Sequence, residues 1–94
     1  MSAKANGDVQ EDNDTTRVTR WSFAPGAETG FHRHEYDYVV VPLTSGALNI
    51  VDKEGTESTA QLAAGVSYFR RAGVEHNVIN ASGGAFAFVE IEFK

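Results

Sequence analysis

Short runs of alternating apolar and polar residues fill the chain from Arg17 onward. Within residues 17–24, for example, Thr19, Trp21 and Phe23 fall on one face of an extended chain. Turn-forming residues, mostly glycine with a polar or small neighbour, separate each run from the next. Strands are predicted over residues 17–24, 29–35, 37–43, 47–51, 56–63, 67–71, 75–80 and 85–93.

Helical periodicity is nearly absent. Apolar residues never recur every three or four positions for long enough to predict a core helix, and residues 59–64 are the only helix-tolerant piece. Eight short strands, spaced about ten residues apart, are typical of an all-β sandwich or barrel. Closure into a barrel would also leave few strand edges exposed in so small a domain.

The first sixteen residues have a different composition. They carry four acidic residues against one lysine, and Met1 and Val9 are their only sizeable apolar side chains. Such a segment buries too little surface to offset its ordering entropy. We therefore predict a flexible acidic tail over 1–16 and one β-barrel domain over 17–94.

Composition narrows the function classes. The 94 residues include 8 basic and 13 acidic side chains, a net charge of −5, which argues against a nucleic-acid partner. The absence of cysteine excludes disulfides, thiolate metal sites and cysteine nucleophiles. No apolar leader or membrane-length run is present, so a cytoplasmic protein without a membrane partner is expected.

The three histidines form the chemically informative pattern. His32 and His34 are two residues apart in a predicted strand, so they point to the same face. His76 begins a later strand, which can lie beside the first in an antiparallel barrel. Imidazoles gathered in this way can bind one metal ion at about 2 Å each.

Two segments have a more specific spacing. They read GAETGFHRHEYDYVVVPLTSG over residues 26–46 and GVSYFRRAGVEHNVIN over residues 65–80. The segments resemble the two motifs of the cupin superfamily, G-x5-H-x-H-x3/4-E-x6-G and G-x5-P-x-G-x2-H-x3-N. The resemblance implies a double-stranded β-helix, or jelly-roll barrel, of about eight short strands, with His32, His34 and His76 as metal ligands.

The segments depart from the family pattern at two positions. The motif glutamate falls on Val39, or on Tyr38 with the alternative spacing, so the usual carboxylate ligand is missing. Asp37 has the same strand parity as Val39 and is a candidate replacement. The motif proline falls on Arg71. The site otherwise resembles the three-histidine variant of the cupin metal centre.

Three neutral imidazoles leave the full charge on a divalent ion, which favours anionic ligands in its open positions. The resemblance implies iron first, with zinc, manganese or nickel as alternatives, and oxygenase-type chemistry on a small organic or amino acid. Within the superfamily, the chain is most similar to small bacterial cupins labelled as β-alanine-degradation proteins. The alternative is a non-catalytic module that binds a metal and a small ligand, as a sensor or with a structural metal.

Other residues are candidates for the pocket or the surface. Phe23 and Tyr68 could wall the cavity, although alternating aromatics are more often core. Arg70 and Arg71 face opposite sides of a strand, so only one of them could orient a substrate carboxylate, and Arg71 is the candidate for that role. The strand over 85–93 has an apolar half on both faces, which favours a homodimer.

Overall fold

The computed structural model describes residues 3–94. These residues form nine strands, all paired antiparallel, in two sheets. The strands are β1 (Asn6–Asp12), β2 (Thr16–Phe23), β3 (His32–Arg33), β4 (Asp37–Pro42), β5 (Gly46–Asp52), β6 (Glu57–Leu62), β7 (Tyr68–Arg70), β8 (Glu75–Asn80) and β9 (Phe86–Phe93).

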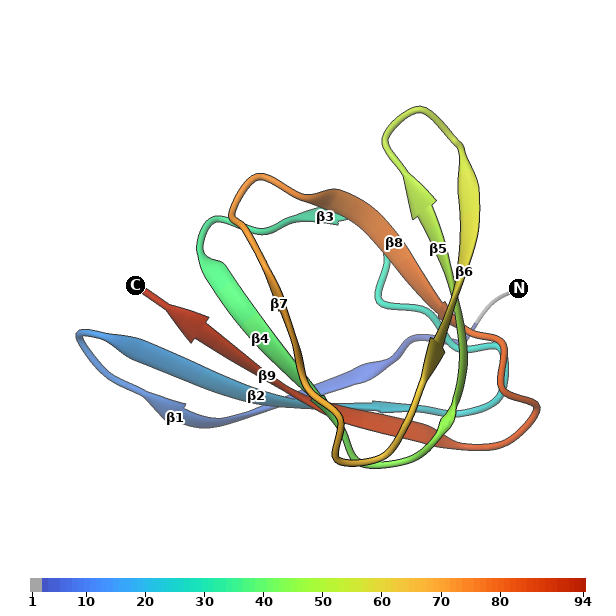
Figure 1. Ribbon diagram of the computed structural model, residues 1–94, viewed down its shortest axis with the longest axis horizontal. Coiled ribbons are helices and arrows are strands. Elements are labelled where there is room, and N and C mark those ends of the chain that lie inside the picture. Colours follow the sequence, from blue (N-terminus) through green and yellow to red (C-terminus); the bar gives the residue numbers. More distant parts are fainter. Residues whose placement is uncertain (1–2) are drawn as a thin grey trace.

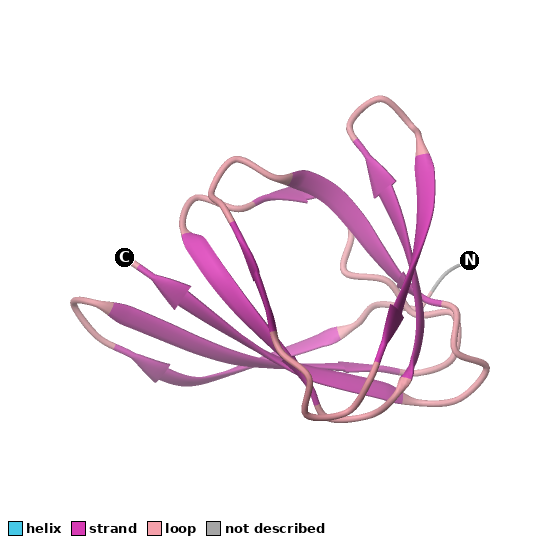
Figure 2. Ribbon diagram, viewed as in Figure 1, coloured by secondary structure: helices cyan, strands magenta, loops and turns pink. Residues whose placement is uncertain are grey.

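The two sheets enclose the interior between them (Figure 1). One has five strands in the order β1-β2-β9-β4-β7, and the other has four in the order β3-β8-β5-β6. Consecutive strands often lie in different sheets, as in a jelly roll. Figure 2 shows only strands and loops in the described part of the chain, so no helix there is long and apolar enough to cross a membrane.

The all-β prediction is confirmed, and the eight predicted strands correspond to β2–β9. Alternation places each side chain as expected. On β4, Tyr38, Val40 and Pro42 are buried, whereas the residues between them are partly exposed. The strand period of two therefore decides which residues face the interior.

The predicted flexible tail needs a correction for residues 6–12. They form β1, which pairs along β2, while Met1 and Ser2 lie outside the described residues. All seven residues of β1 are exposed, so main-chain pairing holds the strand and no apolar pattern marks it. The Asn13 side chain accepts hydrogen bonds from the backbone N–H groups of Thr15 and Thr16, each at 3.0 Å, and so shapes the turn into β2.

The apolar core gathers where β9 begins. Phe86 lies opposite Phe23 in the β2–β9 register, and their ring centroids are 6.4 Å apart in an edge-to-face arrangement. Phe23 is also 5.5 Å from Phe88. Phe23, Phe86 and Leu48 are almost fully buried. This packing supports the strands that carry the histidines at the other end of the interior.

Candidate metal centre

The structure brings the three histidines together. His32 on β3 pairs directly with His76 on β8, and His34 follows one residue after the end of β3. The Nε2 atoms of His32 and His34 are 3.0 Å apart, and those of His34 and His76 are 3.1 Å apart. Three imidazole nitrogens from two adjacent strands thus converge on one point.

The backbone fixes the orientation of His32. Its Nδ1 lies 2.9 Å from the carbonyl oxygen of Gly30. A carbonyl oxygen only accepts hydrogen bonds, so Nδ1 carries the proton and the lone pair of Nε2 points toward the other two rings. A metal-binding histidine usually has such a donor bond from its second nitrogen.

The cluster is chemically incomplete without a cation. Each Nε2 can form one hydrogen bond or metal bond in the plane of its ring, through either a proton or a lone pair. The Nε2 of His34 therefore cannot form proper hydrogen bonds to both neighbours, and the Nε2 of His32 has no proton to donate. One shared ion accepts all three lone pairs at once.

The nitrogen separations also fit a metal ion. Two nitrogens bound at about 2.1 Å and at right angles to each other are about 3.0 Å apart. The observed separations of 3.0 and 3.1 Å agree with this value. His32, His34 and His76 form a group whose candidate ligand atoms all lie within 4.8 Å of one another.

Burial keeps two of the imidazoles in the neutral form that binds metal. It lowers the pKa of His34 to about 4, with the electrostatic influence of the nearby His32 ring as a smaller cause. Burial likewise lowers the pKa of His76 to about 4, aided by His32, His34 and Arg70. These two rings therefore hold free lone pairs at neutral pH.

Tyr38, rather than Val39 or Asp37, fills the inward position near the missing glutamate. Its ring stacks on that of His34, with the centroids 3.9 Å apart and the planes at 17°. Val39 belongs to the opposite face of β4. Asp37 accepts a 2.7 Å hydrogen bond from the backbone N–H of Ala72, so it stabilises the turn after β7 and does not replace the glutamate.

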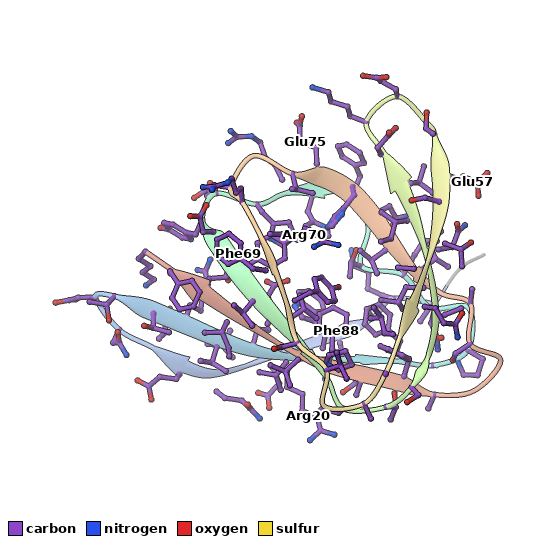
Figure 3. The ribbon with its side chains drawn as sticks, viewed as in Figure 1. Arg20, Glu57, Phe69, Arg70, Glu75 and Phe88 are labelled. Carbon is purple, nitrogen blue, oxygen red and sulfur yellow. The ribbon has the colours of Figure 1, made fainter. Side chains whose placement is uncertain are left out.

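Of the other residues predicted for the pocket, some line it and others do not. Tyr68 lines the cavity, whereas Phe23 belongs to the core and does not line it. Arg70, rather than Arg71, lies on the interior side of β7, because it pairs with the inward-facing Tyr38. Figure 3 shows Arg70 directed between β7 and β8.

Two connected spaces adjoin the histidines. A cavity of about 30 Å³ lies among the three rings, Tyr38, Tyr68 and Glu90. An open groove of about 510 Å³ shares Tyr38, Tyr68 and His76 with that cavity and extends to Arg70. The cavity has room for an ion and a water molecule or two, and the groove has room for a small organic molecule.

Glu90 is the site residue that sequence reasoning missed. It is 8% exposed and lines the histidine cavity from β9. Burial and the neighbouring charge of Glu92 raise the pKa of Glu90 to about 7. The sequence held the signal, because Glu90 and Glu92 have the same strand parity as the core residues Phe86 and Phe88.

Fold and site together define a β-barrel with a histidine-lined interior, and comparison with known proteins identifies its class. The family model of the cupin domain matches residues 19–92. The chain therefore belongs to the cupin family, as its two motifs suggested.

Particular relatives are similar over almost the whole length. The β-alanine degradation protein BauB of Pseudomonas aeruginosa is 62% identical over 86 residues, which cover 92% of this chain and 90% of that protein. The crystal structure of a cupin domain from Bordetella pertussis Tohama I superimposes with a TM-score of 0.96 at 55% identity, covering 100% and 97% of the two chains.

More distant structures share the fold alone. The polyketide cyclase RemF of Streptomyces resistomycificus is 18% identical, with a TM-score of 0.73 over 98% of this chain and 68% of that one. A shared fold does not imply a shared reaction, so function must be argued from the site.

Proposed function

We propose that this protein is a metal-dependent cupin that binds a small organic acid beside a three-histidine metal ion and oxidises it with O2. The convergence of three Nε2 atoms carries the proposal. A divalent transition metal would supply Lewis acidity there, and iron would add redox chemistry; zinc, manganese and nickel are the alternatives. In a dioxygenase reaction both oxygen atoms enter the product, so no external reductant is needed.

The groove beside the histidines supports an anionic substrate. Arg70 lines it with a guanidinium group that lies 4.5 Å over the ring of Tyr68 and donates a 2.9 Å hydrogen bond to the Phe69 carbonyl. A guanidinium held in this way has N–H groups left for a carboxylate. The substrate carboxylate would bind Arg70, and its other end would reach the histidine cavity past Tyr68.

The name of the P. aeruginosa relative refers to β-alanine degradation. We therefore include small amino and oxo acids in the proposed substrate class. The volume of the groove, about 510 Å³, suits molecules of this size.

Metal analysis followed by O2 uptake tests the proposal. Protein purified without added metal is assayed for iron, zinc, manganese and nickel, then reconstituted anaerobically with Fe2+ and mixed with a panel of three-carbon acids bearing amino, keto or thiol groups. We expect iron binding and substrate-dependent O2 uptake with one panel member. Full zinc occupancy with no O2 uptake after iron loading would contradict oxygenase chemistry.

A second candidate is a non-catalytic module that holds a metal and senses a small ligand. The small size of the histidine cavity, about 30 Å³, favours it, because little room remains beside an ion. In that case the panel acids would change the ligand-field spectrum of Co2+-loaded protein without any turnover by the iron-loaded protein.

We also propose that two copies pair through the outer face of the five-stranded sheet. In the strand register, Val18, Ile91, Val39 and Phe69 form one apolar row across β2, β9, β4 and β7. Pairing would cover the row and stabilise a small domain. Sedimentation analysis should show a dimer, and Ile91→Glu should convert it to monomer; a wild-type monomer at all concentrations would contradict the proposal.

A further inference from the structure

Two buried carboxylates on the inward face of β9 have different surroundings. Glu92 is 7% exposed and is bound by Arg17, whose Nε lies 2.9 Å and Nη2 3.4 Å from its oxygens. Glu90 is 8% exposed, and no hydrogen bond or ion pair from residues 3–94 reaches its carboxylate. Its oxygens are not fully sealed from solvent, but a largely buried carboxylate without a protein partner loses much of its hydration, so Glu90 requires an explanation.

Glu90 lies against the histidine cluster. Its side chain lines the same cavity as the three imidazoles. The candidate ligand atoms of Glu90, Glu92 and His34 lie within 4.8 Å of one another. Glu90 belongs to this second group and not to the group of three histidines, so it stands beside the cluster and His34 joins the two.

We propose that Glu90 is the charge-compensating positioning residue of the metal centre: from β9 and outside the ligand set, its carboxylate supplies the negative charge that the inward face of β4 lacks. This inference rests on the proposed metal-binding function. The inward position on β4 is Tyr38, which offers a ring and no charge at neutral pH.

Charge arithmetic explains why the site needs such a residue. Three neutral imidazoles leave two positive charges on a divalent ion in a largely buried cavity, where electrostatic interactions are strong. Arg17 already neutralises Glu92, and Arg70 adds a further positive charge at the groove. Glu90 is the carboxylate in this cavity that lacks a cationic partner, so it is free to attract the ion.

The role predicts opposite effects with and without metal. Glu90→Gln keeps the shape of the side chain and removes its charge. In the metal-free protein this removes an unpaired buried charge, so the melting temperature should rise. Metal binding should weaken, because outer residues of metal sites typically contribute about 10- to 100-fold in affinity. A residue with only a packing role would not produce opposite signs.

The experiment titrates metal-free wild-type protein and variants with Co2+ in mildly alkaline buffer and follows the ligand-field bands. We expect Glu90→Gln to weaken Co2+ binding about 10- to 100-fold, and Glu90→Asp, which keeps the charge, to retain most of the affinity. Glu75→Gln is the matched control. It changes net charge equally on the strand that carries His76, but Glu75 lies outside the barrel and pairs with Lys53 (Figure 3).

The outcomes separate the two proposals. If wild-type protein binds Co2+ and Glu90→Gln binds it within about twofold as tightly, the role of Glu90 is wrong and the three-histidine site stands. Equal losses in Glu90→Gln and Glu75→Gln would also refute it, because net charge alone would explain them. If wild-type protein binds no Co2+, the proposed function and this inference both fail.

Discussion

The inward face of β9 has two halves that differ in almost every respect. Phe86 and Phe88 begin the strand in contact with Phe23, in an apolar end of the interior. Glu90 and Glu92 follow at the same spacing, and both are also buried, at 8% and 7% exposed. The first half has packed hydrocarbon around it, and the second has a cavity, charges and histidines.

The residues of β2 that pair with β9 also change from apolar to polar along the strand. On β2, Phe23 and Trp21 lie opposite the two phenylalanines, whereas Thr19 and Arg17 lie opposite the two glutamates. Both halves obey the same alternation, so strand period alone sets which face is buried. The residue types then decide whether the buried space stabilises the fold or holds chemistry. Mutations in the two halves should therefore have separable effects.

The largest expected effect is in the aromatic half. Phe86→Ala should lower the free energy of unfolding by about 3–5 kcal/mol, because it leaves a cavity where Phe23 and Phe88 now pack. Urea denaturation of the metal-free protein measures the loss. In the fraction that remains folded, Co2+ affinity should stay near the wild-type value; a parallel collapse of affinity would show that the two halves are coupled.

In the polar end of the interior, where β8 brings His76 close to Glu90, the corresponding change is His76→Ala. We expect the variant to lose most of its bound metal, about 100-fold or more in affinity, because one of three converging nitrogens is removed. The far-ultraviolet circular dichroism of the metal-free variant should remain that of a folded β-protein. Metal content equal to that of wild type would refute the ligand assignment.

The pH dependence of stability should arise from the histidines and Glu90 in the polar end of the interior. His34 and His76 have pKa values of about 4 in the folded protein against an ordinary 6.5, so the unfolded chain binds more protons and stability falls as pH falls from 6.5 toward 4. Glu90 has the opposite effect on how stability changes with pH. Its folded pKa of about 7 exceeds the ordinary 4.5, so protonation favours the folded state between those values.

Two histidines against one glutamate leave a net uptake of about one proton on unfolding between pH 4.5 and 6.5. Denaturation of metal-free protein across this range should show stability decreasing with acid. The stability of the Glu90→Gln variant should decrease more steeply with acid, because the carboxylate that opposes the two histidines is gone. A shallower slope in that variant would show that Glu90 does not titrate as described.

Much of the fold could be predicted because its signal is local. Alternating runs located β2–β9, and glycine-rich turns separated them. The strand β1 gave no such signal, since all seven of its residues are exposed and it is held by backbone pairing with β2 and an ion pair between Asp12 and Lys94. An edge strand that buries no apolar face leaves no apolar pattern in the sequence.

The site also has parts that the sequence could predict and parts that it could not. The His-x-His spacing and the second motif predicted which imidazoles meet, because parity and strand pairing suffice for that. Counting motif positions from Gly46 selected Val39, yet burial along β4 shows Tyr38 inside. Glu90 comes from β9, which lies outside both motifs, so parity with Phe86 and Phe88 was its only local sign. Which strand adjoins which is a tertiary fact that spacing does not contain.

The smallest predicted effect compares two adjacent arginines, Arg70 at the end of β7 and Arg71 just after it. Arg70 lines the groove next to Tyr68, whereas Arg71 lines neither that groove nor the histidine cavity. Arg70→Gln should weaken binding of a small carboxylate ligand about tenfold, the order of one charge-assisted pair at a solvent-accessible position. Arg71→Gln removes the same charge one residue away and should leave affinity nearly unchanged. Calorimetric titration of the metal-loaded protein with the active panel acid measures both. Equal effects would mean that long-range charge attracts the ligand, whereas an effect confined to Arg71 would place the acid outside the groove.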